Sequence, residues 1–194
     1  MPKIILASKS KVRKKILDEN DILNEVKPSN VDEDIVKLSL LKEKATPEII
    51  SKNLAELKAN KVSNKYVDDL VLGADSVIDL EGELISKPKD RNEALRILKK
   101  LNGKIHQLIS SVCIYKNGSM VWNHTDKAIL TMKKMREDEH KSYLAKISDE
   151  ALYAYNVYQI EGEGRNLFLS INGNENTIMG LPVEKIKKYL DNYK

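Results

Sequence analysis

The pair Asn117-Gly118, which lies between two long apolar runs, restricts the fold of this chain more than any other feature. Asn-Gly favours the left-handed turn that joins two antiparallel strands. Strands are therefore expected at about 104–116 and 119–132, and any sheet that the chain forms must contain this antiparallel hairpin.

The rest of the chain alternates short apolar runs with segments of helical periodicity. Further strands are expected at 3–7, 70–79 and 167–169, an extended segment at 24–31, and helices at about 11–20, 33–44, 46–62, 91–101, 137–147 and 182–193. This alternation, combined with the hairpin, predicts an α/β fold with a mixed β-sheet.

Size and composition fit one globular domain spanning residues 1–194. With 41% hydrophobic and 32% charged residues the chain can bury a substantial core. No apolar run approaches the roughly 20 residues that cross a bilayer. The N-terminal apolar stretch is too short for a signal peptide, so a cytoplasmic protein is expected. The net charge of +4 suits a small anionic substrate without demanding nucleic acid.

Cysteine and histidine offer little chemistry. Cys113 is the only cysteine, so no disulfide can form within the chain, and its apolar neighbours predict a buried structural thiol rather than a nucleophile. The three histidines are scattered, and no His/Cys group has the spacing of a zinc site.

The segment 8–14 joins the first predicted strand to a basic helix, with Ser10 as the expected N-cap. A helix N-terminus offers free N–H groups and the positive end of the helix dipole, so it can hold a phosphate. The hydroxyls of Ser8 and Ser10 and the guanidinium of Arg13 could add donors. The alternative is a capped helix with a solvated basic face.

Carboxylates in two segments could hold a divalent cation. Asp32-Glu33 opens a predicted helix, where acidic residues also simply complement the dipole. Gly73-Ala74-Asp75-Ser76 is expected to form a turn after an apolar strand run, where α/β proteins place ligands. Asp75 could bind metal or position a water there; the alternative is an ordinary strand-end turn.

Two loops complete the set of candidate segments. Pro88 holds Lys87 extended, and a projecting lysine near Asp90 suits the neutralisation of phosphate charge. Residues 158–164 contain two glycines close to a carboxylate, which fits a loop that wraps a flat ligand and equally fits a plain loop. Together the segments supply carboxylates for a cation and cations for phosphates, both of which phosphoryl transfer requires.

The order of these motifs resembles the Maf family of nucleoside triphosphate pyrophosphatases. The resemblance runs from residue 3 to about 190. It rests on Leu6-Ala7-Ser8-Lys9-Ser10, Val31-Asp32-Glu33, Leu54-Ala55-Glu56-Leu57-Lys58-Ala59, Gly73-Ala74-Asp75, Lys87-Pro88-Lys89-Asp90, Gly103-Lys104-Ile105-His106, Glu161-Gly162-Glu163-Gly164 and Met179-Gly180-Leu181-Pro182.

The resemblance implies an elongated mixed sheet with flanking helices in two lobes, and an active site in the cleft between them. It also implies a divalent metal cofactor, Mg²⁺ or Mn²⁺, and often a homodimer. The implied reaction converts a nucleoside triphosphate and water into a nucleoside monophosphate and pyrophosphate, with no nucleic-acid or membrane partner.

Position by position, Asp75 matches the proton acceptor proposed for the family, and Arg13 matches a phosphate-binding arginine. Glu33, Lys58, Lys87 and Asp90 match its other polar site residues. We expect Glu33 and Asp75, with Asp90 as a third candidate, to hold the metal. Lys58, Lys87 and Arg13 would offset charge on the leaving pyrophosphate, and Ser8, Ser10, Ser76 and Glu161 complete the expected substrate-binding set.

Two departures from the family pattern matter. The first loop usually reads Ser-Pro-Arg-Arg, and Ser10-Lys11-Val12-Arg13 lacks the proline and the first arginine. Glu161 stands where members acting on thymidine or uridine triphosphates carry Gln and where the branch acting on 7-methylguanosine triphosphate carries Glu. A carboxylate can accept two hydrogen bonds from a guanine edge, so Glu161 favours a guanine-type or modified base. Ser76 replaces the more usual Thr or Gln and is ambiguous.

Three other functions stay open on the sequence alone. One is a pyrophosphatase for thymidine or uridine triphosphates. Another is a non-catalytic nucleotide-binding regulator of cell division, which the loss of Asp75 or Lys87 would favour; both are present. Nucleic-acid binding is disfavoured because only 5% of the residues are aromatic and no stacking motif is visible.

Overall fold

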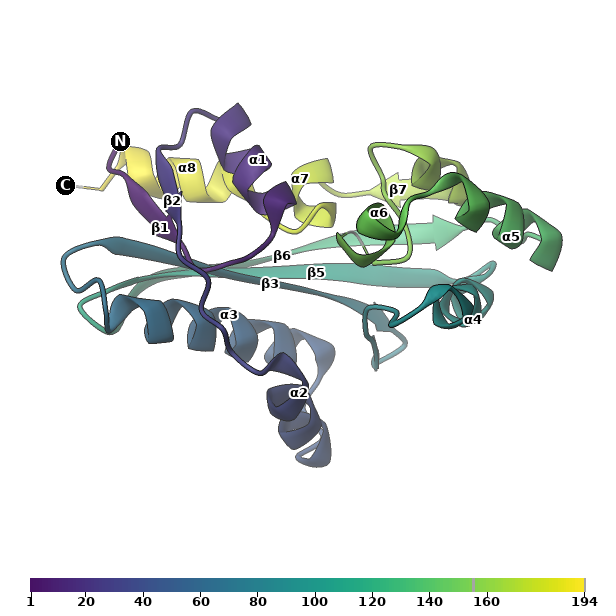
Figure 1. The fold of residues 1–194 in the computed structure, drawn as a ribbon, viewed down its shortest axis with the longest axis horizontal. Coiled ribbons are helices and arrows are strands. Elements are labelled where there is room, and N and C mark those ends of the chain that lie inside the picture. Colours follow the sequence, from purple (N-terminus) through teal and green to yellow (C-terminus); the bar gives the residue numbers. More distant parts are fainter. Residues whose placement is uncertain (155, 194) are drawn as a thin grey trace.

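The computed structural model describes residues 1–154 and 156–193, and within them seven strands form one mixed sheet (Figure 1). The order along the sheet is β2-β1-β3-β5-β6-β7, with β4 paired to β3. The first three strands in this order are parallel and the other pairings are antiparallel. The bounds are β1 Ile4–Leu6, β2 Asn24–Val26, β3 Leu70–Leu80, β4 Glu83–Ile85, β5 Ile105–Lys116, β6 Ser119–Met132 and β7 Phe168–Asn172.

The predicted hairpin is confirmed. Strands β5 and β6 pair along nearly their whole length, and the turn between them places Asn117 at φ 53° and Gly118 at φ 71°. Both residue types tolerate this left-handed conformation. The hairpin and β3 form the long central part of the sheet, to which the shorter strands add at the sides (Figure 1).

Helices cover both faces of the sheet, as the α/β expectation requires (Figure 1). Ser10, Thr46 and Asp90 cap α1, α3 and α4 through their side chains, and for Ser10 this is the N-cap that the sequence predicts. The short elements β4, α6 and α7 are not predicted by the sequence. The helices are α1 Lys11–Glu19, α2 Glu33–Lys42, α3 Pro47–Ser63, α4 Arg91–Leu101, α5 Glu137–Lys146, α6 Asp149–Ala154, α7 Glu175–Ile178 and α8 Val183–Asp191, with a 3₁₀ turn at Glu163–Leu167.

Buried side chains form separate clusters along the sheet, and the two large clusters correspond to the two lobes of the molecule. One large cluster packs α1 and α8 against β1 and the first half of β3, with Ile16 and Leu72 among its members. The other packs α4 and α5 against the far ends of the long strands, with Ile78 and Leu98. A smaller cluster lies under α3. None of the helices in the described part of the chain has the length and apolar character that crossing a bilayer requires.

The expected turn at Gly73–Ser76 is wrong, because these residues lie within the continuous strand β3. β1 pairs with β3 only over Leu70–Leu72 and β4 only over Ile78–Leu80. Between these two strands the edge of β3 has no partner strand among the described residues, although its other edge pairs with β5 throughout. A gap in the sheet, rather than a strand end, therefore opens Asp75 and Ser76 to a ligand.

Gly73 serves the packing of α3 against β3 and not the turn that its residue type suggests. A Cβ at this position would lie 2.1 Å from the carbonyl oxygen of Ala55 and 2.8 Å from the Cβ of Ala59, both on α3. The glycine lets helix and strand approach closely, which is a second use of glycine in a strand besides turns. That approach brings α3 close to the strand positions that form the site.

Candidate active site

The gap in the sheet opens into a cavity of about 1080 Å³ between the two lobes. Its walls come from the β1–α1 loop, the start of α2, Lys58 of α3, the middle of β3, the Lys87 loop and segment 178–180. Further lining residues are Ser148, Glu150, Ala151, Asn156 and Gln159. This volume is at the upper end of the usual range for small-molecule sites. The cavity can therefore take a ligand the size of a nucleotide.

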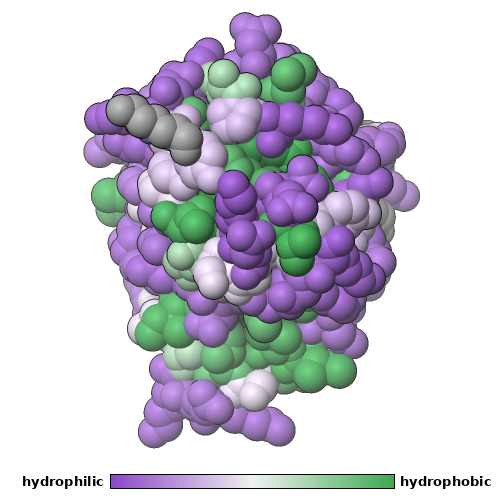
Figure 2. Space-filling model, turned by 90° about the vertical axis from the view of Figure 1, so that its left-hand side faces the viewer, coloured by the Kyte–Doolittle hydropathy of each residue, from purple (hydrophilic) through white to green (hydrophobic). Residues whose placement is uncertain are grey.

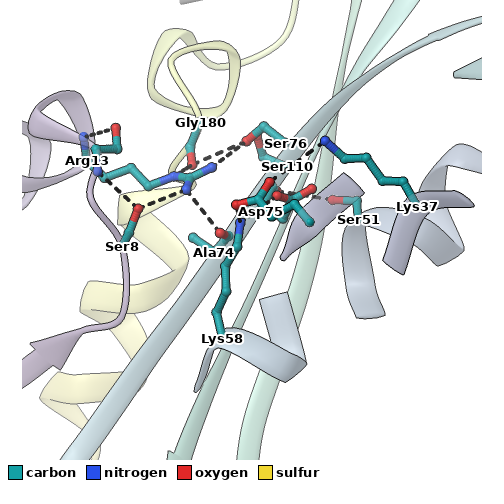
Figure 3. A network of polar contacts seen from close by, with 12 residues as sticks. Ser8, Arg13, Lys37, Ser51, Lys58, Ala74, Asp75, Ser76, Ser110 and Gly180 are labelled. Carbon is teal, nitrogen blue, oxygen red and sulfur yellow. Dashed lines mark hydrogen bonds and ion pairs between the residues drawn. The ribbon is translucent and has the colours of Figure 1, made fainter. Parts of the chain in front are cut away.

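Lys58 joins two carboxylates at one wall of the cavity. Its Nζ lies 2.8 Å from Oδ1 of Asp75 and 2.8 Å from Oε1 of Glu33. Lys58 and Asp75 are 5% and 4% exposed, so their charges must compensate each other (Figure 3). Ser51 donates to the backbone oxygen of Asp75 at 3.1 Å and fixes the strand there.

Glu33 is less buried, and its side chain is 40% exposed. Burial opposes its ionisation, but the cations of Lys58, Lys37 and Arg13 outweigh burial and hold the pKa of Glu33 below its usual value. Glu33 is therefore a carboxylate at neutral pH. It lies at the first position of α2, where the helix dipole also favours negative charge.

Among the described residues, one carboxylate oxygen of Asp75 has no hydrogen-bond partner. Oδ2 is buried and has no hydrogen bond among the described residues, while Oδ1 is held by Lys58. A buried unpaired carboxylate oxygen is costly, and natural proteins keep such groups where an ion, water or ligand completes them. Oδ2 is thus the atom of this site best suited to a metal ion or a water proton.

The Arg13 guanidinium is bound inside the protein by four acceptors (Figure 3). Nε donates to the carbonyl of Gly180 at 2.9 Å, and Nη1 donates to Ser8 Oγ at 3.1 Å and to the carbonyl of Ala74 at 3.0 Å. Nη2 donates to Ser76 Oγ at 3.3 Å. Because a guanidinium has five N–H groups, one on Nη2 keeps no acceptor among the described residues. Burial lowers the pKa of Arg13, and Asp75 and Glu33 oppose this.

Lys87 lines the cavity and remains accessible to solvent. Protein atoms around the ammonium reduce the hydration of its charged form although the side chain as a whole is exposed. This effect and repulsion from Arg13 lower the pKa of Lys87 to about 8, while Glu33 and Asp75 act in the opposite direction. An ammonium whose pKa is lowered this far gains stability when an anion binds beside it, which is what a site prepared for an anion would show.

The structure brings together most of the predicted site residues. Those that line the cavity are Ser8, Ser10, Arg13, Glu33, Lys58, Asp75, Ser76 and Lys87. Asp90 does not line it: the residue is exposed, and its side chain accepts from the backbone N–H of Glu93 as the N-cap of α4. Glu161 is also exposed and outside the lining. In the described ranges no three His, Cys, Asp or Glu side chains cluster closely enough to enclose a metal ion.

Sequence reasoning missed several lining residues on the far side of the cavity. Asn156 and Gln159 contribute amides there, and Leu108, Ile178 and Met179 contribute apolar surface. The glycine-rich segment 158–164 pointed to this region, but to Glu161 rather than Gln159. An apolar surface with a few polar groups is typical of a site for a flat ring.

His106, from the family motifs, and the single cysteine Cys113 are both structural. His106 is 2% exposed, its Nε2 lies 3.0 Å from the hydroxyl of Tyr158, and burial lowers its pKa to about 4, so it is neutral. The expectation for Cys113 is confirmed: the thiol is buried, and burial raises its pKa to about 12.

Comparison with known proteins agrees with this geometry. The model of the family described as Maf-like protein matches residues 3–193. A protein of Pelagibacter ubique named nucleoside triphosphate pyrophosphatase is 74% identical over 96% of both chains. A Rhizobium etli protein named 7-methyl-GTP pyrophosphatase is 36% identical over 94% of this chain and 92% of its own. A solved HAM1 protein from Coxiella burnetii has a TM-score of 0.51 over 100% of both chains at 11% identity, which shows a shared fold alone.

Proposed function

Because the chain belongs to the family of Maf-like proteins, we propose that it is a nucleoside triphosphate pyrophosphatase that releases a nucleoside monophosphate and pyrophosphate. The observation that carries the proposal is the buried Lys58 between Asp75 and Glu33, beside Arg13 and Lys87 on one cavity. This arrangement supplies both carboxylates and cations, which hydrolysis of a phosphoanhydride requires.

The phosphate chain would lie along the cationic side of the cavity. The first turn of α1 offers backbone N–H groups there, and Arg13 keeps one N–H on Nη2. Lys87 adds an ammonium. These donors would neutralise the charge that develops on the departing pyrophosphate, which is where electrostatic stabilisation lowers the barrier.

The residues present fit a divalent cation that is shared with the substrate. Mg²⁺ usually takes one or two carboxylates and completes its shell with water and phosphate oxygens. Asp75 and Glu33 supply two carboxylates beside one ammonium, and Oδ2 of Asp75 lacks a protein partner among the described residues. When bound, Mg²⁺ or Mn²⁺ would neutralise phosphate charge and lower the pKa of a coordinated water.

The chain's own contribution to the proton transfer centres on Asp75. Lys58 fixes Oδ1 and so sets the orientation of the carboxylate, and Oδ2 would either accept the proton of the attacking water or hold the metal that activates this water. The strand on which Asp75 lies is rigid, because its other edge pairs with β5 on both sides of the residue. A well-fixed base is more effective than a mobile one.

For the base we propose a guanine-type ring, including 7-methylguanine. The charge of Glu161 suits the two donors of a guanine edge, and the Rhizobium etli relative carries a name of this kind. Glu161 follows Gln159, which lines the cavity, so a small movement of the loop around a bound base would bring the carboxylate to its rim. The alternative, a thymidine or uridine triphosphate, is an outcome of the test below.

The activity test is pyrophosphate release from a panel of triphosphates with Mg²⁺ or Mn²⁺, comparing wild type with Asp75→Asn. Removing a general base costs roughly 10²- to 10⁴-fold in rate, and we expect kcat to fall within that range. Asp79→Asn is the matched control, since Asp79 lies on the same strand outside the cavity. No turnover of any triphosphate, or equal rates in Asp75→Asn and wild type, would disprove the proposal.

The base preference has its own test in Glu161→Gln. We expect the ratio of kcat/KM for 7-methylguanosine triphosphate to that for uridine triphosphate to fall at least tenfold, because an amide matches a pyrimidine edge better than a guanine edge. The panel should include pseudouridine and thymidine triphosphates. An unchanged ratio would remove Glu161 from base recognition without affecting the proposed hydrolysis.

A further inference from the structure

A series of hydrogen-bonded hydroxyls runs from Arg13 through the partly buried Ser76 to the fully buried Ser110. Nη2 of Arg13 donates to Ser76 Oγ at 3.3 Å, and Ser76 Oγ lies 2.7 Å from Ser110 Oγ. Ser110 Oγ then donates to the backbone oxygen of Thr177 at 2.7 Å. Figure 3 shows Ser76 and Ser110 next to each other, beside the Arg13 guanidinium.

The far end of this series is firmly held. Ser110 and Thr177 are both 0% exposed. The hydroxyl of Thr177 donates to Oδ2 of Asp126 on β6 at 2.6 Å, a bond to a charged group. Asp126 thus fixes α7, and with it the Thr177 carbonyl that accepts the hydrogen bond from Ser110.

These contacts determine which group donates in each hydrogen bond between Arg13 and Thr177. A serine hydroxyl has one proton to donate, and a carbonyl can only accept. Ser110 donates its hydrogen bond to the backbone oxygen of Thr177, so its own oxygen must accept the hydrogen bond from Ser76. The oxygen of Ser76 in turn accepts from Arg13. The other acceptor for Ser76, the carbonyl of Gly180, is farther away at 3.4 Å. Hydrogen bonds aligned in one direction strengthen each other.

We propose that Ser110 is a positioning residue for the phosphate chain: acting through Ser76, it fixes the Nη2 end of the Arg13 guanidinium towards the cavity. The part of this inference that concerns phosphate rests on the proposed function. Nη2 is the nitrogen that keeps a free N–H, and within the described residues Ser76 is its only acceptor. The carbonyls of Gly180 and Ala74 and the hydroxyl of Ser8 hold the other two nitrogens.

Loss of the Ser110 hydroxyl would therefore act at the phosphate-binding nitrogen. Without Ser110, the Ser76 proton can turn to Gly180, and the Ser76 oxygen no longer has a fixed orientation towards Nη2. A neutral hydrogen bond contributes about 0.5–1.5 kcal/mol, which corresponds to roughly a 2- to 12-fold change in binding.

The experiment compares Ser110→Ala with Ser111→Ala. Ser111 is the next residue of β5, is 1% exposed, and bonds through its hydroxyl to Thr125 on the opposite face of the sheet. With Mg²⁺ and the α,β-methylene analogue of GTP, which cannot be cleaved at the reacting bond, we expect calorimetry to show roughly 5-fold weaker binding for Ser110→Ala. Ser111→Ala should bind like wild type, and Ser110→Thr, which keeps the hydroxyl, should restore affinity.

A readout that does not depend on nucleotide separates this inference from the proposed function. The Nη resonances of Arg13, identified with Arg13→Lys, should be resolved in wild type and in Ser111→Ala, because an immobilised guanidinium does not rotate. In Ser110→Ala the Nη2 resonances should shift and broaden, because Nη2 loses a fixed acceptor, while those of Nη1, held by Ser8 and Ala74, should stay unchanged. Equal spectra of the two alanine variants would overturn the positioning role even if the protein binds no triphosphate.

The remaining outcomes are also decisive. If the Nη2 resonances of Arg13 shift in Ser110→Ala while the affinity of a binding-competent enzyme is unchanged, the link to phosphate is wrong. If Ser110→Ala does not fold, as judged by its melting temperature against Ser111→Ala, then Ser76→Ala removes the same contact to Nη2 from the other end and is judged by the same two measurements.

Discussion

At the scale of single residues, the charge of Lys87 depends strongly on the cavity around it. Its pKa of about 8 means that the ammonium form, which binds phosphate, is lost as the pH rises through 8. We expect the dissociation constant of the α,β-methylene analogue to be flat from about pH 7 to about 8. Above about pH 8 the dissociation constant should rise, approaching roughly tenfold per pH unit. Calorimetry up to about pH 9.5 would measure this rise.

The substitution Lys87→Arg tests the assignment, because a guanidinium stays protonated throughout this range. Its dissociation constant should not show the rise. Lys89→Arg is the control, since Lys89 also lines the cavity two residues away, and it should keep the wild-type profile. A rise that persists unchanged in Lys87→Arg would mean that another group titrates.

Site residues can be predicted from the sequence when they lie in segments with recognisable local signals. They cannot be predicted when their place in the site depends on how distant segments pack. Helix starts, a proline-held loop and the order of the family motifs are enough to predict eight residues that line the cavity: Ser8, Ser10, Arg13, Glu33, Lys58, Asp75, Ser76 and Lys87. The gap in the sheet beside Asp75 is invisible in the sequence, since it depends on where two other strands stop. Asp90 and Glu161 likewise sit in suitable segments but outside the cavity lining.

At the scale of elements, α2 is held mainly by its beginning. All of its residues are described, and none is buried; Ile35 and Leu38 are 65% and 61% exposed. Figure 1 shows α2 projecting beyond α3, and Figure 2 shows a band of hydrophobic surface near the bottom of the view, at the level of α2. The ion pair of Glu33 with Lys58 joins its first residue to the site.

We therefore expect Glu33→Gln to loosen the whole helix. A neutral amide keeps the shape of the side chain but loses the attraction of Lys58, so amide hydrogens of Glu33–Lys42 should exchange at least roughly threefold faster by mass spectrometry. Asp34→Asn, one position along the same helix and not paired with Lys58, should exchange like wild type. Equal rates in both variants would show that the helix is held in some other way.

Elements are predictable from sequence when they carry their own end signals. The Asn117-Gly118 turn and the caps Ser10, Thr46 and Asp90 set boundaries that agree with the structure within a few residues. Strand β4 and helices α6 and α7 have only three, six and four residues, which is too short for periodicity to appear.

At the scale of the whole molecule, two hydrophobic clusters share one set of long strands. β3 and β5 supply buried members to both the cluster under α1 and α8 and the cluster under α4 and α5, and β6 contacts both. The predicted two-lobed sheet is confirmed, and the cavity lies between the lobes over the middle of these strands. The homodimer that the family resemblance implies stays a prediction, which light scattering of the purified protein would test.

The shared strands lead to a prediction about cooperativity. Trp122, the only tryptophan, packs against the α1–α8 cluster, whereas Leu98 is fully buried in the other cluster. Leu98→Ala should destabilise the protein by roughly 2–5 kcal/mol. Because the strands continue from one lobe to the other, tryptophan fluorescence and far-ultraviolet circular dichroism should report one coincident urea transition, shifted equally for both signals. Ile16→Ala, in the cluster beside Trp122, should shift the same transition. If Leu98→Ala moved only the circular dichroism signal, the lobes would unfold separately, and the cavity would lie between two independent units rather than on a continuous sheet.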